Sequence, residues 1–222
     1  MNSYTITAAT ATLLVSVTAA NAAPVIYSGF DAGAGSLAAA PNATAAAADF
    51  DAAVSVDSVT DFEAVNAPTE FSLTFSDPIF SSSRTNDSSC SPALCGYNTT
   101  AGGQYFALAF GTTATFTFNN SIDAFGAYFT GWQFNGQTIT YTDGSTEVLD
   151  MPIGDNSNGG TLFFGFVADG KSIASIAYNS LSDFVSIDDV RLSVSQVPIP
   201  ATTWLFVSGL LGLVGIARRK LS

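Results

Sequence analysis

The sequence predicts an all-β fold, an antiparallel β-sandwich placed between an N-terminal signal peptide and a C-terminal transmembrane helix. Apolar and polar residues alternate with a period of two through the body of the chain, and the alternating segments are rich in Phe, Thr, Val and Tyr, which favours strands over helices. An uncharged apolar run at each end predicts the other two elements. The body, about 145 residues from first to last strand, is long enough to bury one core.

Residues 1–22 are predicted to be a signal peptide. The stretch from Ile6 to Ala20 is apolar and uncharged, and Ala20-Asn21-Ala22 supplies the small-x-small pattern that signal peptidase accepts, so cleavage is expected after Ala22. No Lys or Arg precedes the apolar run, so the α-amino group must supply the positive charge. An Ala/Thr-rich disordered start is the alternative.

Residues 23–49 are predicted to be a flexible lead-in, because they are rich in Ala and Gly. A short helix at 43–48 is the alternative. The sandwich domain is expected over residues 50–196, and ten segments within it are predicted strands: 54–60, 70–75, 104–110, 112–118, 122–130, 137–142, 145–150, 161–167, 172–178 and 184–194. TDGS at 142–145 predicts a hairpin, with Asp143 and Gly144 able to take positive φ.

The C-terminal stretch 197–222, VPIPATTWLFVSGLLGLVGIARRKLS, combines two prolines, an apolar run and three cations. Residues 201–217 carry no charge, and a helix of that length reaches about 26 Å, just enough to span a bilayer core. Residues 218–220, which are Arg218, Arg219 and Lys220, then predict a cytoplasmic C-terminus and an exported body. Three adjacent cations argue against a buried core helix.

The order of Val197, Pro198 and Pro200, then the apolar run, then the cations resembles the PEP-CTERM sorting signal of Gram-negative bacteria that make exopolysaccharide. The resemblance implies that the tail holds an exported protein at the inner membrane until an exosortase, a membrane-embedded cysteine protease, removes it. Ile199 departs from the family pattern, which has Glu between the prolines, so cleavage is the step that the departure puts in question. A single-pass anchor that is never cut is the alternative.

The charge of the body limits its partners. All 18 acidic residues lie between Asp31 and Asp189, and residues 23–200 contain only three basic residues, Arg84, Lys171 and Arg191, which gives this part of the chain a net charge of −15. Nucleic acid is therefore not an expected partner, because its phosphates would be repelled.

The two cysteines predict a small disulfide loop. Cys90 and Cys95 flank a short segment, CSPALC, and an oxidising compartment favours a bridge at that spacing. A zinc site is disfavoured because the chain has no histidine and two thiolates do not fill a tetrahedral site.

A second resemblance concerns the body. VTDFEAV at 59–65 and SDFVSIDDVRLSV at 182–194 resemble the first and last strands of galactose-binding-like jelly-roll domains, which occur in many carbohydrate-binding modules. The resemblance implies a jelly-roll-like sandwich with a structural calcium ion between its terminal strands, held by Asp61, Glu63 and Asp188 or Asp189. Carboxylates and backbone carbonyls would suffice for calcium. The alternative is that these acids protect exposed strand edges.

Catalysis has little support in the sequence. The absence of histidine excludes Ser-His-Asp and Cys-His sites. Paired carboxylates are used by glycosidases, but no spacing selects one pair here. Asp188 and Asp189 are not expected to act together, because neighbouring strand residues point to opposite faces.

Three aromatic residues are candidates for glycan binding. Trp132 and Phe134 lie on the same side of an extended stretch, and Tyr97 lies in a glycine-rich segment; aromatic rings form platforms for sugars when they are exposed. The alternative is that these rings belong to the core.

Together these features predict an exported, non-catalytic protein of the cell surface or extracellular matrix, associated with exopolysaccharide. Its expected partners are signal peptidase, an exosortase, the inner membrane before processing and extracellular polysaccharide, and calcium is the one expected cofactor. The alternative function is a secreted glycan-active enzyme that uses paired carboxylates.

Overall fold

The computed structural model describes residues 23–63, 69–75, 84–85, 91–99, 103–108, 113–132, 136–152, 159–168, 170–178 and 185–194. The predicted signal peptide at 1–22 and the predicted sorting tail at 197–222 lie outside these ranges. Within the described ranges no helix is long and apolar enough to cross a membrane.

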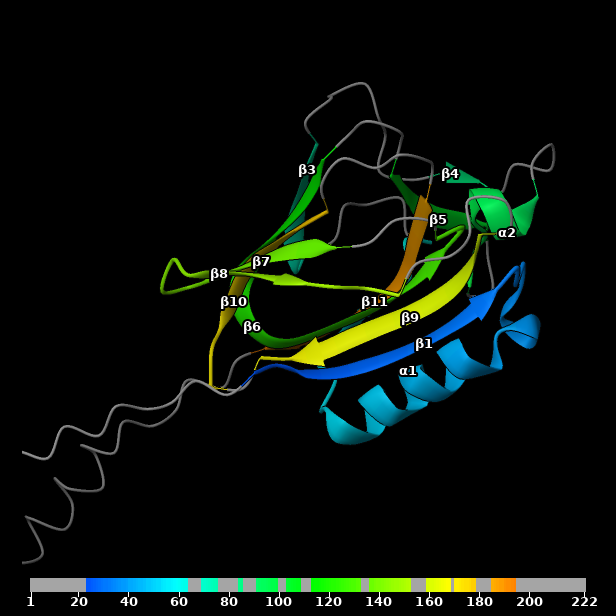
Figure 1. Cartoon of the computed structure of the whole chain (residues 1–222). Helices are drawn as coiled ribbons and strands as arrows, with labels where there is room; N and C mark the ends of the chain where they lie inside the picture. Colours follow the sequence, from blue (N-terminus) through cyan, green and yellow to red (C-terminus); the bar gives the residue numbers. More distant parts are fainter. Residues whose placement is uncertain are drawn as a thin grey trace, which may run out of the picture.

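The strands form one continuous antiparallel sheet, which β6 folds into the two layers of the predicted sandwich, and a helix packs on the outside of one layer (Figure 1). The two layers are called here the first and the second sheet. The first sheet contains, in order, β3 (Phe71–Phe75), the first half of β6 (Ala114–Thr130), β10 (Ile173–Tyr178), β7 (Gln137–Tyr141) and β8 (Thr146–Leu149). The second contains β1 (Val25–Ala32), β9 (Gly160–Val167), the second half of β6, and β11 (Val185–Val194).

Three short strands and three helical elements complete the second sheet and its surroundings. β5 (Gln104–Leu108) and β2 (Ser58–Thr60) pair with different parts of β11, and β4 (Arg84–Thr85) pairs with β5. The helical elements are η1 (Leu37–Ala39), α1 (Pro41–Ala53) and α2 (Pro92–Cys95). The sequence did not predict β1, β4 or α2.

Strand β6 joins the two sheets. Its residues 114–118 pair with β3 and β10, and its residues 124–130 pair with β9 and β11. The sequence predicts two strands here, 112–118 and 122–130, because the polar stretch from Asn119 to Ser121 resembles a turn. That stretch instead continues the 17-residue strand through a bend, where its side chains are exposed or half-buried.

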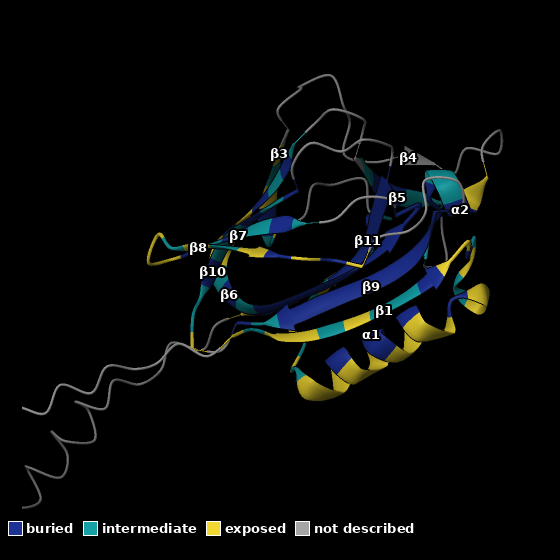
Figure 2. Ribbon diagram, in the orientation of Figure 1, coloured by how far each residue is buried: buried dark blue, intermediate teal, exposed yellow. Residues whose placement is uncertain are grey.

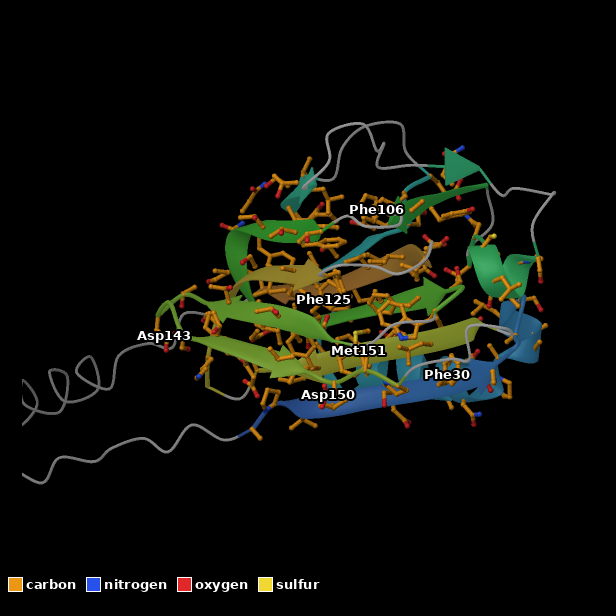
Figure 3. The ribbon with its side chains drawn as sticks, turned by 45° about the horizontal axis from the view of Figure 1, so that its top comes forward. Phe30, Phe106, Phe125, Asp143, Asp150 and Met151 are labelled. Carbon is orange, nitrogen blue, oxygen red and sulfur yellow. The ribbon has the colours of Figure 1, made fainter. Side chains whose placement is uncertain are left out.

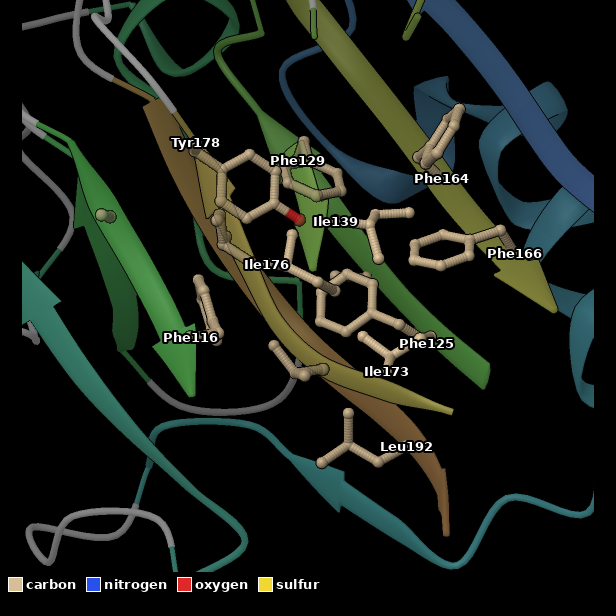
Figure 4. Close-up of a cluster of buried hydrophobic side chains, with 14 of the residues drawn as sticks. Phe116, Phe125, Phe129, Ile139, Phe164, Phe166, Ile173, Ile176, Tyr178 and Leu192 are labelled. Atoms are coloured by element: carbon tan, nitrogen blue, oxygen red, sulfur yellow. The ribbon is translucent and has the colours of Figure 1, made fainter. Parts of the chain in front are cut away.

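Large apolar side chains fill the space between the sheets. Phe125, on β6, packs against Phe116 and Phe118 of the same strand and against Phe166 of β9. Figure 4 shows the rings of Phe116, Phe125 and Phe166 beside Ile139 of β7 and Ile173 and Ile176 of β10. In Figure 2 the buried residues follow β6, β9 and β11 through the middle of the molecule. One core therefore unites both sheets.

The β7–β8 hairpin confirms the turn predicted at 142–145, with one difference. Gly144 has φ +82 and its N–H donates to the carbonyl of Tyr141, whereas Asp143 does not have positive φ. The Asp143 carboxylate accepts hydrogen bonds from the backbone N–H and the hydroxyl of Ser145, at 2.8 and 2.6 Å. Figure 3 shows Asp143 at the tip of this hairpin. The turn is a type I turn followed by a left-handed glycine.

The prediction of a flexible lead-in at 23–49 is wrong. The alternative, a short helix at 43–48, is correct, but the helix that forms, α1, is longer than predicted. Residues 25–32 form β1 at the edge of the second sheet, and α1 covers the outer face of that sheet. The Asp31 carboxylate accepts hydrogen bonds from the backbone N–H groups of Asn42 and Ala43, at 3.3 and 2.8 Å, so it caps the N-terminus of α1. The alanine-rich composition that suggests flexibility supplies small side chains that let the helix lie close to the sheet.

A hollow formed by two glycines holds the ring of Phe50, the large apolar residue of α1. Gly126 and Gly165 face each other across β6 and β9, on the outer face of the sheet. A Cβ atom at Gly126 would lie 3.0 Å from the Phe50 ring, and one at Gly165 would lie 2.7 Å from it. The ring also packs against Tyr27 and Phe163.

Replacing Gly165 with alanine should therefore destabilise the protein. The new methyl group would overlap the Phe50 ring, and overpacking of this kind costs about 1–3 kcal/mol in the free energy of unfolding. Chemical denaturation would measure the loss. Gly103→Ala is the matched control, because a Cβ atom there meets nothing within 4 Å; equal losses in the two variants would contradict this account of the hollow.

Candidate functional site

One end of the second sheet carries a row of four buried polar residues on its outer face. The strand register places Asp31, Thr161, Thr130 and Ser186 side by side across β1, β9, β6 and β11. All four are buried, with exposed fractions between 0 and 9%. We call these four residues the polar row.

The polar row holds the segment that contains α2. The hydroxyl of Thr130 accepts a hydrogen bond from the Tyr97 N–H and donates one to the Tyr97 carbonyl, each at 2.9 Å. The Tyr97 hydroxyl is 2.6 Å from the hydroxyl of Thr161, and burial raises the pKa of Tyr97 to about 12. Gly96, at φ +83, is the point of closest approach, since a Cβ atom there would lie 2.0 Å from the Ser186 Oγ atom.

A β-bulge in β11 follows the polar row. Asp188 pairs with Tyr128 and Arg191 pairs with Gly126, so β11 has one residue more than β6 between these two pairs. Asp189 supplies the irregular backbone with φ +50. The inward-facing residues of β11 change from odd to even numbers across this point: Val185, Ile187, Val190 and Leu192.

The bulge brings two carboxylates to one hydroxyl group. Asp188 Oδ2 lies 2.8 Å and Asp189 Oδ2 lies 3.1 Å from the Oγ1 atom of Thr99. Asp188 Oδ2 also accepts a hydrogen bond from the Thr99 N–H at 2.7 Å. The prediction that Asp188 and Asp189 point to opposite faces is therefore wrong, because strict alternation applies only to a strand without an extra residue.

Glu63 binds residues on both sides of Thr99 in the chain; the described residues 98–99 and 103–104 are called here the Thr99 loop. One of its carboxylate oxygens accepts hydrogen bonds from the Asn98 side-chain amide and from the Gln104 N–H, and the other accepts one from the Gly103 N–H. The Glu63 N–H in turn donates to the carboxylate of Asp61 at 3.1 Å. The described ends of this loop, at residues 98–99 and 103–104, are thus bound by acidic side chains from two separate segments.

The carboxyl groups differ in acidity for physical reasons. Burial raises the pKa of Asp188 to about 7, against the hydrogen bonds from Thr99 and together with the nearby charge of Asp189. Burial also raises the pKa of Asp189, although the Arg191 guanidinium lowers it. Burial also raises the pKa of Glu63, but the hydrogen bonds from Gln104, Gly103 and Asn98 together lower it by a larger amount. The pKa of Glu63 therefore lies below its usual value.

The four acids proposed for calcium do not form a ready set of ligands. In the part of the chain that the structure describes, no group of three or more acidic or cysteine side chains is arranged to hold a metal ion. Both Glu63 oxygens and Asp188 Oδ2 accept hydrogen bonds from protein donors. Through these bonds the acids bind the loop, and calcium binding stays a prediction.

Two of the three aromatic candidates for glycan binding, Trp132 and Tyr97, are buried. Trp132 is fully buried against Phe129, and its Nε1–H donates to the Pro152 carbonyl at 2.7 Å. Tyr97 is 6% exposed and its hydroxyl is bonded within the polar row. The prediction of a glycan platform at Trp132 and Tyr97 is therefore wrong, because both rings serve packing; Phe134 lies outside the described residues.

Cys95 is disulfide-bonded. It ends α2, whose neighbour Gly96 packs on the polar row. Cys90 is the only other cysteine in the sequence, and it lies outside the described residues, as do Val197, Pro198, Pro200 and the three cations of the tail. The pairing with Cys90 and the sorting motif stay predictions.

Sequence reasoning identified the acids of this site but missed the groups that bind them. Thr99 and Asn98 contribute the donors, and nothing in their local pattern marks them except their place in a polar, glycine-rich segment before β5. Their partners are far away in the sequence, so only the fold brings them together.

The raised pKa of Asp188 predicts that stability falls with rising pH. A carboxyl with a folded-state pKa near 7 and an unfolded-state value near 3.9 stabilises the fold fully below about pH 4, and this contribution is lost as the pH rises through 7. The slope should reach about 1.4 kcal/mol per pH unit at most. Denaturation curves at intervals between pH 4 and 8 would measure it.

Asp188→Asn should flatten this dependence, because an amide still accepts from Thr99 but does not titrate. Asp143→Asn is the control: Asp143 is exposed and its hydrogen bonds to Ser145 lower its pKa, so this variant should keep the decline between pH 4 and 7. An Asp188→Asn variant with the full wild-type slope would contradict the assignment.

A bridge from Cys95 to Cys90 predicts that neither thiol reacts with an alkylating reagent unless a reductant is present. Cys90→Ser should reduce stability only modestly, because the loop it closes is short. Mass spectrometry after alkylation would count the labelled cysteines. Labelling of the unreduced wild-type protein would show that the bridge is absent.

Comparisons with known proteins assign no family to the chain. No family model matches it, and no curated protein matches it significantly. Among solved structures, the enzymatically active domain of tailspike protein 4 of bacteriophage CBA120 is similar over 61% of this chain, with 15% identity and a TM-score of 0.37. This chain covers only 20% of that tailspike chain.

A second solved structure is a family 11 carbohydrate-binding module of a cellulosomal cellulase from Clostridium thermocellum. It is similar over 62% of this chain and 95% of its own length, with 8% identity and a TM-score of 0.34. Neither TM-score is high enough to assign a shared fold or a shared function.

Proposed function

We propose that this protein is an exported, non-catalytic domain of the cell surface or extracellular matrix, held at the membrane by its C-terminal tail until an exosortase releases it, and associated with extracellular polysaccharide. Calcium is not part of this proposal, because the acids named for it bind protein donors instead. The proposal assigns the domain a structural or binding role.

One observation carries the proposal: the chain enters and leaves the domain at the same end of one sheet. Val25 pairs with Val167, Val167 with Ala124, and Ala124 with Ser193. The start of β1 and the end of β11 are therefore three strand spacings apart, roughly 14 Å. The polar row and the Thr99 loop lie at or toward the opposite end of these strands. This geometry suits a domain tethered at one end.

The charge of the domain indicates which polysaccharides it would accept. A net charge of −15 over residues 23–200 repels polyanions. The polysaccharide proposed as partner is therefore a neutral one, recognised by hydrogen bonding and apolar contact rather than by charge.

The alternative of a glycan-active enzyme receives support from one feature, the Asp188–Asp189 pair with its raised pKa values. The position of the pair argues against it, because Asp188 is 0% exposed and Asp189 is 6% exposed. A substrate would have to displace the Thr99 loop before it reached either carboxylate. The non-catalytic function is therefore preferred.

The test uses the full chain in an exopolysaccharide-producing host, with and without its exosortase. The protein recovered from the medium should have lost the C-terminal span by intact mass, and deletion of the exosortase should leave the full-length form in the membrane. Replacement of Arg218, Arg219 and Lys220 by alanine should impair this sorting. Full-length protein in both hosts would reduce the tail to an uncut anchor.

The released protein is then mixed with the neutral fraction of the host polysaccharide. It should co-sediment with that fraction without releasing reducing ends. Release of reducing ends that Asp188→Asn and Asp189→Asn both abolish would favour the enzyme instead, and absence of co-sedimentation would overturn the polysaccharide association.

A further inference from the structure

The outer face of the first sheet carries two rows of small side chains that cross all five of its strands. The strand register aligns one residue from each strand in each row. In order from β3 to β8, the first row is Ser72, Thr117, Ser175, Thr140 and Thr146, and the second row is Thr74, Thr115, Ala177, Thr138 and Val148. We call these ten residues the hydroxyl face, because all but Ala177 and Val148 carry a hydroxyl group.

The hydroxyl face is accessible to solvent. None of its ten residues is buried, whereas residues between them on the same strands, such as Phe116, Ile139 and Ile176, are fully buried. The two described α-helices, α1 and α2, both pack against strands of the second sheet (Figure 1). An exposed strand face is normally polar, so exposure alone does not indicate a partner.

The hydroxyl face carries no charge, although the protein is strongly acidic. None of its ten residues is acidic or basic, while residues 23–200 have a net charge of −15. Glu70 precedes β3 and Asp150 follows β8, so both acids stand outside the rows. Glu147 lies between the rows in sequence but accepts a hydrogen bond from the hydroxyl of the buried Tyr141, at 2.7 Å. Solvent-exposed surfaces usually mix charges of both signs, so a face without charge favours a neutral partner.

The hydroxyl face is long and narrow. Neighbouring strands lie about 4.8 Å apart, so a row that crosses five strands is about 19 Å long. Residues two apart along a strand are separated by about 6.7 Å, which is therefore the distance between the two rows. A strip of these proportions fits an extended chain better than it fits a compact molecule.

The side chains of this strip match the two kinds of surface that a neutral sugar chain offers. Serine and threonine hydroxyls both donate and accept hydrogen bonds, as sugar hydroxyls do. The threonine methyl groups, together with Ala177 and the 64% exposed Val148, offer apolar contact to the C–H faces of sugar rings. No aromatic ring belongs to the ten residues, so each sugar unit is bound weakly and affinity comes from many small contacts along the chain.

We propose that the hydroxyl face binds an extended chain of a neutral polysaccharide, which lies across the five strands along the two rows. This inference rests on the function proposed above, and it names the surface that performs that function. Because the contacts are single hydroxyl and methyl groups, the face discriminates against charged chains but selects little among neutral ones. A second copy of the same face is the competing occupant.

The test uses the full-length chain in mild detergent and native gels that contain the neutral fraction of the host exopolysaccharide, in which retardation measures Kd. Thr117→Val and Thr140→Val each remove one hydroxyl and keep a β-branched side chain. Each should raise Kd about 2–10-fold, as loss of one neutral hydrogen bond does. Thr60→Val is the matched control, because Thr60 is a half-buried threonine of β2 that pairs with β11 in the second sheet; its Kd should equal the wild-type value.

The length of the polysaccharide provides a second readout. Fragments of the neutral fraction should bind more tightly as they lengthen, until they span the strip of about 19 Å. Monosaccharides should not compete at concentrations at which such fragments do. Stronger retardation by the anionic fraction of the exopolysaccharide would contradict the neutral partner. Melting temperatures close to the wild-type value would show that the variants are folded.

The outcomes separate this inference from the function on which it rests. If the wild type is retarded and both row variants bind equally well, or if Thr60→Val weakens binding as much as they do, the hydroxyl face is not the site and the polysaccharide association remains. If no neutral fraction retards the wild type, the association itself is lost. Sedimentation velocity completes the test, because a wild-type dimer that Thr117→Val dissociates would assign the face to a second copy.

Discussion

The structure depends on one strand, β6, that belongs to both sheets. Its first half pairs with β3 and β10 and its second half with β9 and β11. A strand shared in this way fixes the distance and angle between the layers, so the phenylalanines along it, Phe116 and Phe125 among them, meet in one core. The outer face of the second half of β6 packs against α1, because Gly126 leaves room for that helix. Few substitutions along β6 would affect one layer alone.

The β-bulge in β11 determines how the acidic side chains at this end of the domain are arranged. In a regular strand Asp188 and Asp189 would face opposite layers, and one of them would enter the apolar core. The extra residue of the bulge keeps both on the outer face, where Thr99 binds them. The same device lets Ile187 and Val190 both face inward. The bulge therefore keeps both carboxylates out of the apolar core and places them against Thr99.

The sequence predicted what depends on short-range pattern. The alternation of apolar residues gave the sandwich and nine of the strands in β2–β11, except that β6 was divided at its exposed polar bend. It failed where long-range contacts decide: the helix α1 is stabilised by Asp31 and by the glycine hollow for Phe50, which a local reading of alanine-rich sequence does not reveal. The sequence also left Trp132 open between a glycan platform and the core, and the fold shows that the ring is buried, as is typical of large aromatic residues in a sandwich.

Two carboxyl groups whose pKa values are shifted in opposite directions bind the Thr99 loop. Glu63 is surrounded by N–H donors, which favour its charged form, whereas Asp188 is buried deeply enough that its neutral form is favoured despite the donors of Thr99. Asp188 therefore takes up a proton at a pH above the usual range for carboxylates, which removes a buried charge. Glu63 stays charged at that pH and keeps its hydrogen bonds. Because a body with a net charge of −15 already gains from losing negative charge, mild acidity strengthens this end of the domain while the Glu63 contact persists. The two carboxyl groups together therefore contribute most to the stability of the fold between the pKa of Glu63 and that of Asp188.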